Sequence, residues 1–263
     1  MKKRLFPQYI KEIFSSPKFY ISVLIITAIA LLGNATNNQK GSLCEFAASF
    51  PGFGFFRIVA YVPACLPFIT SFCDDYTNRY VRAVVVRSGV RRYSLSKFAA
   101  AFLSAFISLF LGFALVLFIL SFKLPLFDVF NDQSFIVYGY FISHGMPVVY
   151  ILIKVFIYSL WGATYAVMGL VVSAVIPNKF LTFATPYAAC SILDEIGYGL
   201  RLPHYLNTLH LGVGERVFGG SVTVPDGLGM TLLNFGYTVL FAAVLCLLLY
   251  LAFDILVERR VHN

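Results

Sequence analysis

Three stretches of the sequence, 98–122, 147–176 and 230–253, are almost entirely apolar. Each is longer than the roughly 20 residues that a helix needs to cross a bilayer core about 30 Å thick. Inside that core every backbone N–H and C=O must be satisfied within the segment, so such stretches form helices. Of the 263 residues, 59% are hydrophobic and only 12% are charged, outside the range of soluble domains. The sequence therefore predicts an all-α, polytopic membrane protein.

Three further apolar stretches are shorter or interrupted. Stretches 19–33 and 58–73 are short, and the second contains two prolines, which a membrane helix tolerates as kinks. Stretch 180–200 is interrupted by Asp194 and Glu195. Together, the six stretches predict six transmembrane helices in a single transmembrane domain that covers residues 1–263.

Lysine and arginine are unevenly distributed between the two sides of this predicted bundle. The N-terminus, the loops after the second and fourth spans and the C-terminal tail share one side and carry fourteen of these residues. The opposite side carries five, which are Lys40, Arg57, Lys123, Arg201 and Arg216. Because the Lys/Arg-rich side of a membrane protein is cytoplasmic, we expect a multi-pass protein of the plasma membrane with both termini in the cytoplasm. The net charge of +8 is explained by this placement beside apolar segments, so no nucleic-acid partner is expected.

The first eighteen residues are too polar for a span and have an amphipathic pattern. Leu5, Tyr9 and Ile13 recur every four residues with charges between them. This pattern predicts an interfacial helix over 1–18 that lies against membrane lipid on the inner side.

Residues 74–97, "DDYTNRYVRAVVVRSGVRRYSLSK", form the most basic segment of the chain. Asp74 and Asp75 suit the positive end of a helix, and Asp75 with Arg79 would make an i, i+4 ion pair. Ser88 and Gly89 indicate a helix end before a second basic cluster. The segment therefore predicts an exposed helix on the cytoplasmic side. An alternative is that its arginines only set the topology and contact anionic head groups.

An acidic pair, a basic helix and then "SGVRRYSLSKF" leading into a long third span resemble the permease subunits of type-2 ABC exporters. The similarity is strongest over 57–125 and extends over the chain through the six spans, cytoplasmic termini and long outer segment. The resemblance implies that 74–97 carries the coupling helix, which docks into a groove on a separate ATP-binding cassette subunit. It assigns ATPase coupling to Asp74, Asp75, Arg79, Arg82, Arg87, Arg91 and Arg92. It also implies a dimer with a second permease, identical or related.

No catalytic pattern occurs in the sequence. A phosphate-binding loop needs GxxxxGK[ST], and the nearest stretch, "LGVGERVFGG" (211–220), lacks the lysine. We therefore expect that this chain is not an enzyme and binds no cofactor, and that ATP and Mg are held by the partner subunit. His204 and His210 would share a metal ion only if the outer segment folded suitably, and ordinary surface histidines are the favoured interpretation.

The outer segment 201–229 contains too few apolar residues for another membrane crossing. Its leucines and Tyr205 would half-bury a short helix, and later glycines and Pro225 allow a turn back into the sixth span. We expect a re-entrant or interfacial hairpin that forms an outer gate.

Two charges inside the predicted spans have similar depth. Lys154 lies about 10 Å from the outer end of the fourth span, and Asp194 about 9 Å from that of the fifth. Charges in a membrane usually face a cavity or a partner, so we expect Lys154 to face Asp194 or Glu195 in a pathway that Tyr158 and Tyr165 continue. The alternative is that Lys154 snorkels to head groups and the acids end a short fifth span.

Small residues form two stripes at helical spacing. Such stripes let membrane helices approach closely, and contact within one bundle is favoured over contact across a dimer. The stripes are Ala100, Ser104, Ser108 and Gly112 in the third span, and Gly162, Ala166, Gly169 and Ser173 in the fourth.

The functional prediction is a permease subunit that moves a substrate outward while its partner hydrolyses ATP. One alternative is a substrate-binding membrane module of an uptake system, which has no need of a basic helix after the second span. The other is an intramembrane enzyme that uses Asp194 and Glu195.

Overall fold

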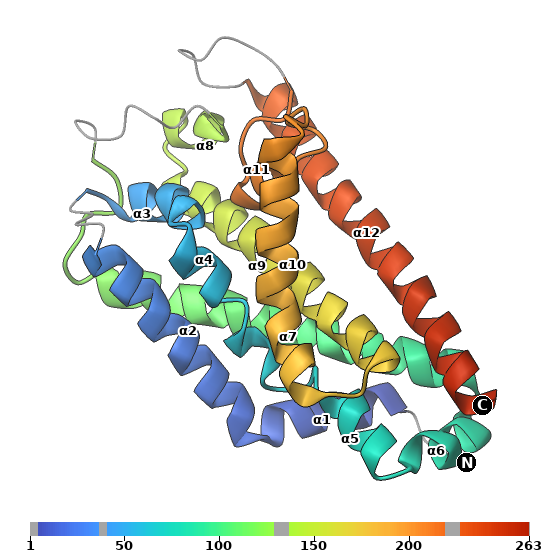
Figure 1. Cartoon of the computed structure of the whole chain (residues 1–263). Helices are drawn as coiled ribbons and strands as arrows, with labels where there is room; N and C mark the ends of the chain where they lie inside the picture. Colours follow the sequence, from blue (N-terminus) through green and yellow to red (C-terminus); the bar gives the residue numbers. More distant parts are fainter. Residues whose placement is uncertain (1–4, 37–40, 129–136, 219–226, 263) are drawn as a thin grey trace.

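The computed structural model describes residues 5–36, 41–128, 137–218 and 227–262, and these residues form helices joined by loops (Figure 1). Lys2, Lys3, Arg4 and Lys40, which entered the charge count, and 219–226 of the predicted outer segment lie outside the described residues. The helices are α1 (Leu5–Ser15), α2 (Pro17–Thr36), α3 (Leu43–Ser49), η1 (Phe50–Gly52), α4 (Phe55–Val59), η2 (Pro63–Cys65), α5 (Ser71–Thr77), α6 (Tyr80–Ser88), α7 (Val90–Leu120), α8 (Gly139–Ser143), α9 (Pro147–Val175), α10 (Lys179–Gly199), α11 (Thr208–Val213) and α12 (Leu228–His262).

Four helices, α2, α7, α9 and α12, are long and apolar enough to cross a membrane. They correspond to the predicted first, third, fourth and sixth spans. A bent pair of helical segments between α2 and α5 raises the number of candidate crossings in the described residues to five. By helix length and hydropathy the chain is a multi-pass membrane protein, whereas the prediction of six spans is not confirmed. Helix α10 has 21 residues, but it is not among the helices that are apolar enough to be candidate membrane spans.

The predicted second span, 58–73, differs most from the structure. The segments Leu43–Gly52 and Phe55–Cys65 meet at 84°, as in a broken span or a re-entrant loop, and turns follow from Leu66 to Thr70. The expectation of one kinked helix is therefore wrong. Gly54, at φ 47°, allows the sharp bend, and Pro63 and Pro67 each remove a backbone donor that a continuous helix would use.

Figure 1 places the start of α1 and the end of α12 at the same end of the bundle, together with α5 and α6. We call this the termini end. Helices α3, α8 and α11 lie at the opposite, far end. Helix α1 packs on α7, buries Ile13 and joins α2 at Ser16, so the helix predicted over 1–18 exists over Leu5–Ser15.

The small-residue stripes are buried inside the single chain, which confirms their predicted use within one bundle. Gly112 lies against Ile26 of α2, and its carbonyl accepts a hydrogen bond from Thr27 Oγ1 at 3.2 Å. A Cβ at Gly169 would lie 2.6 Å from the carbonyl oxygen of Thr182 in α10. Close contacts of α9 with α10 and of α7 with α2 therefore depend on glycine.

Gly169→Ala is expected to destabilise the protein by about 1–3 kcal/mol, because the added methyl group meets backbone that cannot move aside. The measurement is the thermal midpoint in detergent, followed by fluorescence-detected gel filtration. Gly236→Ala on α12 is the matched control, since nothing lies within 4 Å of a Cβ there. Equal midpoints for the two variants would contradict the role assigned to Gly169.

Candidate functional site

The basic segment at the termini end is built from two short helices and the start of α7. The single helix predicted after Asp74 is interrupted at Asn78, and Arg79 adopts the left-handed conformation at φ 57° before α6 begins. The predicted ion pair of Asp75 with Arg79 is therefore wrong, and Asp75 pairs with Lys97 instead. The predicted helix end is confirmed, because α6 stops at Ser88 and Gly89 follows at φ 84°.

A buried lysine joins this segment to the bundle. Lys97 on α7 is 2% exposed, and its Nζ lies 2.8 Å from Asp75 Oδ2. Tyr93, one turn earlier on α7, donates its hydroxyl to the same carboxylate at 2.8 Å. The rings of Tyr9 and Phe68 lie 4.9 and 5.0 Å from the ammonium. Burial and the nearby charge of Asp75 raise the pKa of Tyr9, so its phenol stays neutral. We call Lys97, Asp75, Tyr93, Tyr9 and Phe68 the Lys97 lock.

The arginines of the segment face solvent rather than the bundle. Arg79, Arg82, Arg87, Arg91 and Arg92 are all exposed, and we call them the basic surface. Asp74 does not join the lock and pairs with Lys179 at 2.5 Å, where both side chains are exposed. Such a surface pair contributes little to stability, so Asp74 and Asp75 have different roles.

A cleft of about 730 Å³ opens beside the basic surface. Arg260 of α12 closes one side, donating to the carbonyl of Ala174 at 3.2 Å and lying over the ring of Tyr76 at 5.4 Å. Three arginines and no carboxylate are found among the described residues that line it, so the cleft favours an anionic or acidic occupant. The lining residues are Tyr76, Thr77, Arg79, Val81, Arg82, Pro177 and Arg260.

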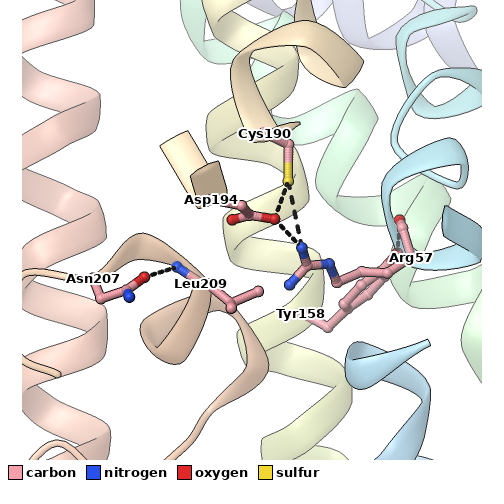
Figure 2. Close-up of polar contacts among 6 residues, drawn as sticks. All are labelled: Arg57, Tyr158, Cys190, Asp194, Asn207 and Leu209. Atoms are coloured by element: carbon pink, nitrogen blue, oxygen red, sulfur yellow. Dashed lines mark hydrogen bonds and ion pairs between the residues drawn. The ribbon is translucent and has the colours of Figure 1, made fainter. Parts of the chain in front are cut away.

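A second ionic cluster lies inside the bundle, as Figure 2 shows. Arg57 of α4 is 4% exposed and forms an ion pair with Asp194 of α10. The thiol of Cys190 lies 3.8 Å from Asp194 Oδ2 and 4.0 Å from the guanidinium. Arg57 Nε and Asp194 Oδ1 have no hydrogen-bond partner among the described residues. The pair joins the bent segment to α10, and its hydrogen bonds are incompletely satisfied.

Tyrosines predicted to line a pathway pack beside this pair. Tyr158 donates its hydroxyl to the carbonyl of Arg57 at 2.8 Å. Tyr61 stacks between Tyr158 and Tyr165, with ring centroids at 5.1 and 5.5 Å. A cavity lined by Lys154 and Tyr158 has a volume of about 10 Å³, roughly the space of one water molecule. These tyrosines are buried within one chain, and their role in a pathway stays a prediction.

Lys154 does not face the acids. Its Nζ donates to the carbonyls of Gly214 at 2.9 Å and Val213 at 3.3 Å, at the end of α11. The predicted pairing with Asp194 or Glu195 is therefore wrong, because Asp194 is taken by Arg57. The snorkelling alternative is also wrong, since the lysine is only 6% exposed and its ammonium binds protein carbonyls. The last carbonyls of a helix lack intrahelical partners, which makes the end of α11 a suitable acceptor.

Glu195 is separated from Asp194 by the geometry of α10. Asp194 is buried, whereas its neighbour Glu195 is exposed, because consecutive helical residues point to different faces. The two carboxylates do not form one site. Both belong to the predicted site, yet only Asp194 contributes to the cluster in Figure 2.

Two important residues were not identified as partners from the sequence. In the sequence, Arg57 stands out only as an outer flanking charge and Lys97 only as the last residue of the basic segment 74–97. Each lies directly before an apolar stretch, but this position does not indicate which acid, on another segment, becomes its partner. Comparisons of the chain with protein-family models, with curated proteins and with solved structures found no match.

Proposed function

We propose that this chain is the membrane permease subunit of an ATP-driven exporter and that α6 couples it to a separate ATP-binding subunit. In this proposal the termini end is cytoplasmic, as the distribution of Lys and Arg indicates. ATP and Mg are held by the partner, and a second permease, identical or related, completes the pathway.

The observation that carries the proposal is an exposed basic surface on and around α6, next to a buried ion pair that joins the flanking helices α5 and α7. A coupling element must be accessible to its partner and also transmit displacement. The basic surface meets the first requirement, since its five arginines are exposed. The Lys97 lock meets the second, because one buried ammonium links Asp75 of α5, the start of α7 and Tyr9 of α1. Because α6 contacts both α5 and α7, which carry Asp75 and Lys97, a force on α6 would act through the lock on α1, α5 and α7.

The charge of this surface also supports a protein partner. Arginines beside a cleft of about 730 Å³ complement a partner that presents carboxylates, and such complementarity guides association and sets orientation. Anionic lipid head groups would also neutralise the arginines. Contact with lipid, however, does not explain why the Lys97 lock fixes the segments next to α6.

Six crossings remain part of the proposal. Helix α10 has 21 residues and is about 30 Å long, enough to cross a bilayer core. With α10 and the bent pair added to the four long helices, the number of crossings is even. This agrees with both ends of the chain lying at the termini end (Figure 1).

The two alternatives receive less support. An intramembrane enzyme would use Asp194 and Glu195 together, and these carboxylates lie on different faces of α10. A substrate-binding module of an uptake system would not need a basic helix fixed to the spans behind the second crossing.

Reversing two charges tests the proposal. Arg79→Glu with Arg82→Glu is expected to abolish co-purification of the ATP-binding subunit and substrate-stimulated ATPase activity, because like charges then face the partner. Both arginines are exposed, so folding should not change. Lys123→Glu with Arg201→Glu, an equal charge change at exposed far-end positions, is the control. If the unaltered chain brings down no ATP-binding subunit, or the first variant behaves like the control, the proposal fails.

A further inference from the structure

Two histidines and one glutamate, residue types that can ligate metal ions, lie close together around the end of α11 at the far end. The helix ends before Gly214, whose φ of 67° lets the chain turn back. Glu215 donates its N–H to the carbonyl of His210 at 2.8 Å, and Gly214 donates to Leu211 at 3.2 Å. These two hydrogen bonds make a Schellman motif, which places the side chains at the His210 and Glu215 positions in contact. Accordingly, His210 Nδ1 and Glu215 Oε2 lie in hydrogen-bond contact.

His204 reaches the same point from the loop before α11. The carbonyl of Pro203 accepts hydrogen bonds from the N–H groups of Leu206 and Asn207 at 2.9 and 3.1 Å. Asn207 then caps α11 through its side chain, which accepts from the N–H of Leu209 at 3.0 Å (Figure 2). This tight turn brings the ring centroids of His204 and His210 to 4.2 Å.

We propose that His204, His210 and Glu215 bind a divalent transition-metal ion, for which Zn²⁺ has the matching chemistry. Their ligand atoms all lie within 4.8 Å of one another. Two imidazole nitrogens and one carboxylate oxygen are zinc ligands, and with bonds of about 2.0–2.1 Å a tetrahedral ion separates its ligands by about 3.4 Å. Closing the site therefore needs side-chain movements of at most about 1.5 Å. The fourth position stays open to water or to a ligand of the ion.

The ion would bind where α9, α10 and α12 meet the outer segment. Lys154 of α9 holds the carbonyl of Gly214, immediately before Glu215. Tyr237 of α12 donates its hydroxyl at 2.8 Å to the carbonyl of Tyr205, immediately after His204. Gly197 of α10 allows the close approach of Asn207. A bound ion therefore cross-links 204–215 and fixes a segment that already contacts α9, α10 and α12. This inference does not depend on the proposed export function.

Zinc titration of the full chain in nanodiscs, without a histidine tag, tests the site. We expect one Zn²⁺ per chain by calorimetry, and at least about a tenfold loss of affinity in His204→Ala, His210→Ala and Glu215→Gln. His144→Ala is the matched control, since His144 is an exposed histidine that follows α8 at the same far end (Figure 1). Co²⁺ bound in place of Zn²⁺ should give the visible absorption of a tetrahedral site, lost in the same three variants.

A measurement on the unaltered chain keeps the test valid if a variant fails to fold. Zn²⁺ should protect His204 and His210, but not His144, from acylation by diethylpyrocarbonate, as read by mass spectrometry. Equal modification of the three histidines in the presence of zinc would overturn the proposal. So would equal affinities of the His204→Ala and His144→Ala variants for the ion.

Discussion

Replacing Arg57 by methionine is expected to destabilise the protein by about 3–5 kcal/mol, because the Asp194 carboxylate is then buried without its counter-charge. Asp194→Leu should have a comparable effect by leaving the guanidinium unpaired. The double variant should recover most of the loss, since an apolar pair of similar volume removes both desolvation penalties. The thermal midpoint in one detergent, compared across the three variants, is the measurement.

Glu195→Leu is the control for these variants, because it removes an exposed acid from the adjacent position of the same helix. Its midpoint should stay close to that of the unaltered chain. If the loss of stability in the double variant equals the sum of the losses in the two single variants, the buried ion pair is not what joins the bent segment to α10. Combining Lys154→Asp with Asp194→Lys should rescue nothing, since Lys154 binds carbonyls of α11 instead.

Asp75→Asn is expected to destabilise the protein by about 2–3 kcal/mol and to uncouple it from its ATPase. The change leaves the Lys97 ammonium, whose side chain is 3% exposed, without its counter-charge. This loss of stability is smaller than for a fully buried pair, because the Asp75 side chain is 24% exposed and water can reach the carboxylate. The measurements are the thermal midpoint and the stimulation of the co-purified ATPase by substrate.

The neighbouring carboxylate provides a matched control for the Lys97 lock. Asp74→Asn breaks only the exposed pair with Lys179, so stability should not change measurably. Adding Lys97→Met to Asp75→Asn should restore stability without restoring coupling, because the lock is still absent. Normal coupling in this stable double variant would show that the lock does not transmit movement from α6.

Features that depend on local chemistry were predictable from the sequence. The long apolar stretches became α7, α9 and α12, because in hydrocarbon a helix is the way for one segment to satisfy its own backbone. Gly89 ends α6 because an isolated glycine accommodates the positive φ there. The stripe that contains Gly112 predicted a close helix contact, and the structure has that contact with α2.

Features that depend on which distant residues meet could not be predicted in the same way. Periodicity indicates a face of a helix and distance along the axis indicates depth, but neither identifies the neighbour on that face. Lys154 and Asp194 have similar predicted depths, yet Asp194 pairs with Arg57 of the bent segment, and Lys154 binds carbonyls at the end of α11. The sequence alone determined a multi-pass helical membrane protein with a basic segment at one end. Only the tertiary structure decided the pairing of its buried charges, because a charge in low dielectric pairs with the opposite charge or dipole that packing brings within reach.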